Sequence, residues 1–350
     1  MKKLLYIVIL SFGISLLTGC AGINFITIQT YEPAQVQLPE RVHSVLIVNN
    51  AATQPSDIGH TRKPIGKHES LKVIANADSI PTIYCGALAQ FLSEENHFDN
   101  VKLYSKPLRS DHHFWEENPI DPEIMNALRN ETGTDALISL DKVVLQTEGV
   151  DFFRQEGYIY GGLTGKINSI LRVYLPSMEG KIPAIEYSDS LHWEGFDIRD
   201  GKASADLILP TPEQAMKELA LNAAEKMTYV FVPHWENQSR WYYTSSNSLM
   251  KEAEVLVKAD KWAEAISKWE TLYNNEKNKH NKAKLASNIA FAYEMLDDMN
   301  SAYDWINISK QLFDETTTEG SLDRKRAELY KNEITRRRDN YNKAKEQAFD

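Results

Sequence analysis

Three alanines in the last third of the chain recur at a constant spacing of 37 residues: Ala253, Ala290 and Ala327. Ala265 and Ala302 are also 37 residues apart, and each follows its partner alanine by 12. Small residues at this separation allow the two helices of a hairpin to approach closely, while bulky neighbours fill the space between hairpins. The repeat therefore predicts stacked helical hairpins in a C-terminal all-α domain.

The repeat divides the C-terminal region into hairpins over about 246–273 and 281–312 and a capping helix over about 321–347. This pattern resembles the tetratricopeptide repeat, with a longer loop between the hairpins. Such stacks form a curved groove that binds a peptide or helix of a partner protein. Four aromatic residues of this region are then candidate partner-binding residues: Trp262, Trp269, Tyr293 and Trp305.

The preceding region, 43–235, has the pattern of an α+β domain, in the order β-α-β-α-β-β-β-α. Ser44–Val48 is a β-branched run typical of a buried strand, and residues 184–193 alternate apolar and polar side chains as a half-buried strand does. Thr211 and Gln214 match a helix capping box. We predict a mixed sheet covered by helices, an α/β sandwich, with a long loop over Asn49–Lys72.

The first 20 residues have the features of a secretion signal. Lys2 and Lys3 precede an uncharged run of 14 residues, which is shorter than the roughly 20 residues that a spanning helix needs. Leu17-Thr18-Gly19-Cys20 then resembles the bacterial lipobox. The resemblance implies a signal peptide over 1–19 and a lipid, such as palmitate, on Cys20, followed by a tether over 20–42.

The residue after Cys20 is Ala21, and no acidic cluster follows it. By resemblance to sorted lipoproteins, these features favour the outer membrane and the face toward the periplasm. An ordinary signal peptide or a single-pass anchor is the alternative to a lipid anchor.

Few residue patterns point to catalysis. There is no P-loop, GxSxG, HExxH or paired CxxC motif. Gly161–Gly165 is expected to form a hairpin turn, and neither His112-His113 nor the pair Glu186 and Asp189 has the spacing of a metal or carboxylate site. We therefore expect no enzymatic activity, no metal and no cofactor. A net charge of −10 also argues against nucleic-acid binding.

Taken together, these features resemble an uncharacterised Bacteroidetes lipoprotein family, a domain of unknown function with C-terminal tetratricopeptide-like repeats. The resemblance lies in Pro39–Asn49, Thr134–Val144 and the aromatic segment from Val232 to Tyr243. It leads to the hypothesis of a membrane-anchored scaffold that binds an unidentified protein or peptide through its repeats. The alternative is an envelope lipoprotein that binds or processes glycans.

Overall fold

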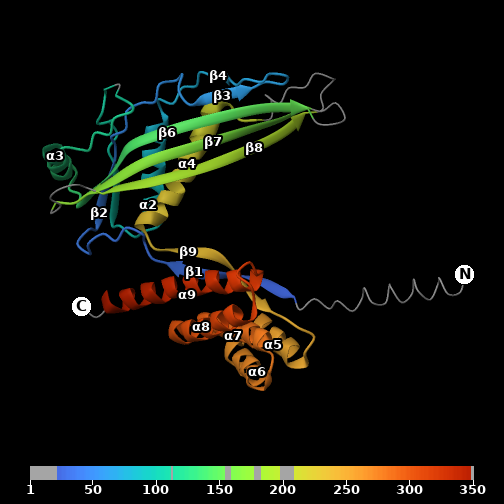
Figure 1. The fold of residues 1–350 in the computed structure, drawn as a ribbon. Coiled ribbons are helices and arrows are strands. Elements are labelled where there is room, and N and C mark those ends of the chain that lie inside the picture. Colours follow the sequence, from blue (N-terminus) through green and yellow to red (C-terminus); the bar gives the residue numbers. More distant parts are fainter. Residues whose placement is uncertain (1–21, 112, 154–158, 177–182, 198–208, 348–350) are drawn as a thin grey trace, which may run out of the picture. The chain divides into compact units, whose positions relative to one another are not determined.

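The protein is described by a computed structural model that covers residues 22–347 apart from 112, 154–158, 177–182 and 198–208. The chain divides into two compact units (Figure 1). One comprises Glu32–His234, and the other combines Trp235–Asp350 with the N-terminal segment through Tyr31. Cys20 and the expected signal peptide lie outside the described residues. No helix within the described ranges combines the length and apolar character needed to cross a membrane.

The first unit is built on a seven-stranded mixed sheet. Its strands are β2 (Ser44–Asn49), β3 (His60–Lys63), β4 (Leu71–Lys72), β5 (Asn100–Leu103), β6 (Ala136–Phe153), β7 (Ile159–Tyr174) and β8 (Ala184–Asp197). β2 pairs in parallel with β5 and β6, whereas β6, β7 and β8 form an antiparallel meander. The predicted order of elements is confirmed, except that the segment expected to be a long loop contains the short strands β3 and β4.

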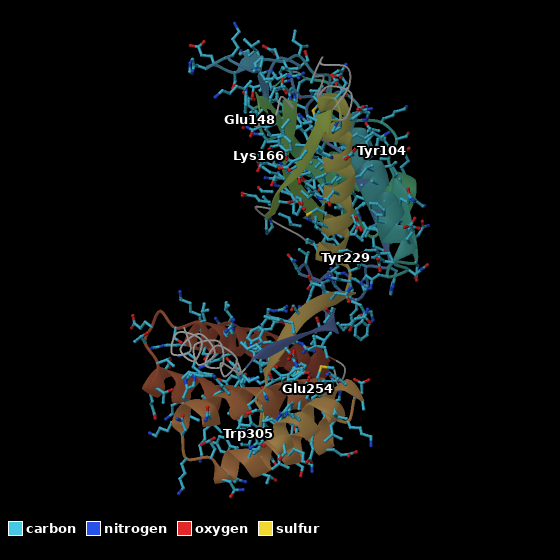
Figure 2. The ribbon with its side chains drawn as sticks, turned by 90° about the vertical axis from the view of Figure 1, so that its right-hand side faces the viewer. Tyr104, Glu148, Lys166, Tyr229, Glu254 and Trp305 are labelled. Atoms are coloured by element: carbon cyan, nitrogen blue, oxygen red, sulfur yellow. The ribbon has the colours of Figure 1, made fainter. Side chains whose placement is uncertain are left out.

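Alternation along β2 determines which helix covers each face of the sheet. Val45 and Ile47 belong to the main core with α2 (Ile80–Glu94) and α4 (Pro212–Phe231). Leu46 and Val48 point the other way, toward α3 (Pro122–Thr132). Because α3 lies only at the β2 end, no helix among the described residues covers the outer face of the meander. Glu148 and Lys166 are exposed on this face (Figure 2).

Local sequence accounts for the start of α4. The Thr211 hydroxyl accepts a hydrogen bond from the Gln214 backbone N–H, and the Gln214 side chain accepts one from the Thr211 N–H, so the predicted capping box is present. The helix then buries Met216, Leu219 and Ala223 against the sheet.

Gly165 lies inside β7, so the expectation of a hairpin turn over 161–165 is wrong. A Cβ at this position would come within 2.7 Å of Leu219 Cδ1 and 3.1 Å of Trp193 Cζ3. The glycine is therefore explained by the close approach of α4 to the sheet, which is one of the recognised reasons for glycine inside a strand.

The second unit contains helices and a two-stranded ribbon. Its helices are α5 (Ser248–Lys258), α6 (Trp262–Asn275), α7 (Lys279–Met295), α8 (Met299–Thr316) and α9 (Leu322–Gln347). Consecutive helices contact one another, as the two predicted hairpins and the final helix require. All five repeat alanines are buried between these helices. This confirms an α+β region followed by a helical region.

The C-terminal region was expected to be all-α, but the helical unit also contains a two-stranded ribbon. β1 (Ile23–Glu32) pairs with β9 (His234–Tyr243), although residues 20–42 were expected to be a tether. The Thr244 N–H donates to the Gly22 carbonyl, and the rings of Tyr31 and Trp235 lie 5.3 Å apart, so the two strands run antiparallel. β1 buries Ile28 in the helical core. The N-terminal segment is thus part of the helical unit.

Candidate interaction surface of the helical unit

The four aromatic residues proposed for partner binding occupy two kinds of position. Trp262 and Trp269 are buried in the helical core, and the Trp262 ring meets Phe291 edge-on at 5.2 Å. Their side chains fill the core and offer no open surface. Tyr293 and Trp305 are half-buried, and Trp305 packs perpendicular to Tyr273 with 5.1 Å between ring centroids (Figure 2). Only these last two retain accessible area.

β9 lies against α7, within the helical region that was expected to form a groove. The side-chain amide of Asn288 donates to the Tyr243 carbonyl at 2.8 Å and accepts from the Tyr243 N–H at 2.7 Å. One residue earlier, the Tyr242 ring stacks nearly parallel to Phe291, with 6.4 Å between centroids. This part of α7 is therefore covered by the chain's own strand.

A buried ionic network fixes β9 between α7 and α9. The Arg240 guanidinium donates to both carboxylate oxygens of Glu294, with Nε at 3.1 Å from each. The Tyr330 hydroxyl donates to Glu294 Oε2 at 2.5 Å, and Arg337 donates to the same carboxylate. The Glu294 side chain is 0% exposed, so these donors replace the water that it would otherwise bind.

Burial and neighbouring charges shift the pKa values of Tyr330 and Arg240 in this network. Burial, together with the Glu294 carboxylate, raises the pKa of Tyr330 well above its ordinary value. Burial of Arg240 favours the neutral form, yet the hydrogen bonds and charge of Glu294 raise the pKa of its guanidinium. The tyrosine hydroxyl and the arginine therefore remain protonated at neutral pH, and the network is suited to holding structure together.

Beside this network, β9 and α9 enclose a hollow of about 380 Å³. Its lining combines carboxylates, a guanidinium, an amide, hydroxyls and apolar side chains: Glu236, Gln238, Ser239, Arg240, Trp241, Leu329, Tyr330 and Glu333. Leu329 is 65% exposed, and the Trp241 indole N–H is buried with no hydrogen-bond partner among the described residues. The hollow is of the size that small ligands or single side chains occupy. Sequence reasoning missed it, because it depends on β9 being a strand.

Asp189, one of the two carboxylates considered as a pair, is used in the structure of the α+β unit itself. Asp189 accepts hydrogen bonds from Tyr187, Asn222 and Lys226. Burial acts to raise the pKa of Asp189, but the hydrogen bonds from Lys226, Tyr187 and the Ser190 N–H, together with the charge of Lys226, lower it to about 2. Glu186 points to the opposite face of β8, as predicted. These two carboxylates therefore do not form a pair.

The histidines considered as metal ligands give no further support for a metal site. His112 lies outside the described residues, and His113 faces Glu116 at 3.3 Å. Across the part of the chain that the structure describes, no cluster of three or more His, Cys, Asp or Glu side chains has the arrangement needed to hold a metal ion.

Two family models match the chain. One is a domain of unknown function, DUF8603, over residues 42–243, which covers most of the α+β unit and all of β9. The second is another domain of unknown function, DUF6340, over residues 251–336 of the helical unit. No curated protein matches the chain. Since the first model spans more than half of the sequence, the chain belongs to the family of the domain of unknown function DUF8603.

Proposed function

We propose that this protein is a lipid-anchored scaffold of the bacterial envelope that binds a partner protein through its helical unit. The lipobox-like sequence ending at Cys20 supports the anchor. Ala21 and the absence of a following acidic cluster favour the outer membrane and the periplasmic face. The tetratricopeptide-like spacing of buried alanines supports a helical array of the kind that serves in protein recognition.

The observation that carries the proposal is the hollow between β9 and α9. It offers hydrogen-bonding groups and an exposed apolar rim at Leu329, which is the combination that anchors a partner side chain. Arg240, which lines the hollow, is held in place by its ion pair with Glu294, so little ordering of this side chain would be required on binding. Because β9 covers the α7 face, this hollow replaces the expected helical groove as the recognition site.

Site-specific photo-crosslinking in living cells tests this assignment. A photoreactive phenylalanine analogue at Leu329 should give a discrete adduct with one envelope protein. The same group at Ala263, an exposed position on α6, is the matched control and should not give that adduct. Equal adducts at both positions, or none at Leu329 in cells that hold the protein at the membrane, would contradict the proposal. Loss of glycan binding on Leu329→Asp would instead favour the glycan-binding alternative.

The anchor is tested separately. Replacement Cys20→Ala should abolish labelling with radioactive palmitate and move the protein from the membrane fraction to the soluble fraction. A mutant that stays with the membrane and keeps its label would exclude lipidation at this residue.

A further inference from the structure

One face of β1 is exposed and almost free of charge. Side chains alternate along the strand, so that Ile26 and Ile28 pack toward the helices while Phe25, Thr27, Gln29 and Tyr31 are exposed. None of these four is charged, although charged residues make up 25% of the chain. Phe25 is 67% exposed and Tyr31 is 56% exposed, which are large apolar areas to leave in water.

The second strand of the ribbon adds a further aromatic ring to this surface. Trp235 is 67% exposed, and its ring lies 5.3 Å from that of Tyr31. Among the exposed residues of β9, only Glu236 carries a charge. We call Phe25, Thr27, Gln29, Tyr31 and Trp235 the ribbon face. Tyrosine and tryptophan rings flanked by uncharged polar groups are typical of protein surfaces at the lipid headgroup region.

The position of the ribbon face relative to the expected anchor indicates its partner. Ile23, where β1 begins, is only the third residue after Cys20, so the connecting chain reaches about 10 Å at full extension. A tether over 20–42 would have allowed roughly 75 Å. A lipid on Cys20 would therefore hold the start of β1, and with it Phe25, within the headgroup region of the bilayer.

We propose that the ribbon face docks on the lipid surface, with β1 lying along the membrane plane and the helices α5–α9 on the side away from it. This inference rests on the proposed lipid anchor. Phe25 and Tyr31 are six residues apart on one strand face, so contact by both requires the ribbon to lie flat. The aromatic rings then add apolar contact to a single-site anchor and fix the orientation of the helical unit.

Fluorescence from a probe on the ribbon face tests this orientation. Lipidated Thr27→Cys protein, labelled with nitrobenzoxadiazole, is placed in vesicles of phosphatidylethanolamine and phosphatidylglycerol that carry spin-labelled lipid. Cys20 is blocked by its lipid and Cys85 is buried, so the label reports position 27. Ser267→Cys on α6 is the matched control, since both replaced residues are exposed hydroxyl side chains. We expect quenching by the spin-labelled lipid to be several-fold stronger at position 27 than at position 267.

Further measurements separate the outcomes. Flotation with the vesicles checks the anchor independently of the probe, and Gln29→Cys replaces Thr27→Cys if the latter does not fold. Phe25→Ser combined with Trp235→Ser should relieve the quenching at position 27 while flotation persists. Flotation with equal, weak quenching at 27 and 267 overturns the docking but leaves the anchor intact. Loss of flotation overturns the anchor itself. A probe at position 27 that is shielded from iodide before vesicles are added shows that protein, and not lipid, covers the face.

Discussion

The side-chain amide of Asn288 in α7 makes one hydrogen bond to the Tyr243 carbonyl and one to the Tyr243 N–H in β9, as a neighbouring strand would. The α+β unit uses the same arrangement. There the Gln54 amide bonds both main-chain groups of Leu145, on the stretch of β6 between its pairings with β2 and β3. In both units a buried amide completes the hydrogen bonds of a strand where no second strand is present.

Replacement Asn288→Ala should destabilise the helical unit by about 2–4 kcal/mol, because it leaves a buried N–H and a buried carbonyl of Tyr243 without partners. Urea unfolding followed by tryptophan fluorescence measures this, since five of the seven tryptophans lie in the helical unit. Asn274→Ala, at an exposed position near the end of α6, is the control and should change stability little. If Asn288→Ala loses no more stability than Asn274→Ala, the two hydrogen bonds of Asn288 do not hold β9 in place.

Replacement Glu294→Gln should destabilise the helical unit more, by about 3–5 kcal/mol, because it removes a counter-charge of the buried Arg240 guanidinium and of the partly buried Arg337 guanidinium. The same unfolding experiment applies. Glu264→Gln removes an exposed carboxylate that lies 3.3 Å from Lys261, and its effect should stay below about 1 kcal/mol. Equal effects for the two glutamine variants would show that the buried network contributes nothing beyond a surface pair.

Local patterns were sufficient for elements whose partners are near in sequence. The capping box of α4 and the alternation of β8 depend on a few adjacent residues, and both are present. The 37-residue spacing likewise identified the positions where helices pack, because each repeat contacts its neighbour. The same reasoning predicted the three consecutive strands that the structure shows as β6, β7 and β8.

The pairing of two strands that lie far apart in the sequence could not be predicted from such local patterns. β1 is β-branched and alternating, but its partner β9 is about 200 residues away, and Pro33 and Pro39 after it suggested a tether. Missing β9 also meant missing the hollow at Leu329 and the burial of the α7 face. Trp262 and Trp269 were proposed as partner-binding residues because periodicity reports which residues share a helix face and not what covers that face.

Stability of the helical unit should fall in alkaline solution. The pKa of Tyr330 is raised in the folded state, so its contribution is complete below the unfolded value of about 10 and is lost as the pH rises through the folded pKa. Burial, followed by the charge of Asp323, raises the pKa of Tyr243 in the same direction. Urea midpoints measured from pH 8 upward should therefore decline above about pH 10. The decline should be shallower in Tyr330→Phe, and an unchanged slope would show that this hydroxyl does not titrate with unfolding.

Replacement Gly165→Ala should destabilise the α+β unit by about 1–3 kcal/mol, since the new methyl group would press on the buried Leu219 side chain. A double-mutant cycle with Leu219→Ala identifies the cause. If the clash with Leu219 is responsible, Gly165→Ala costs less in the Leu219→Ala background, although Leu219→Ala alone leaves a cavity. Additive effects would place the strain in the backbone or against Trp193 instead. Gly320→Ala, with no atom near its Cβ, serves as the control.

Cys85 provides a separate reporter for the α+β unit. It is buried in the main core, and burial raises the pKa of its thiol, so the reactive thiolate is scarce in the folded protein. In a Cys20→Ala background, a disulfide reagent at pH 8 should modify Cys85 only as fast as the α+β unit opens. The rate should rise by a factor of about 1,000 or more in denaturing urea, because a stability of at least 5 kcal/mol leaves less than one molecule in a thousand open. The rate of Cys85 modification should increase in Gly165→Ala, because that variant destabilises the same unit. In Asn288→Ala the rate should stay unchanged if the two units unfold independently. Rapid modification of native protein would contradict the burial of Cys85, and equal acceleration by both variants would show that the units unfold as one.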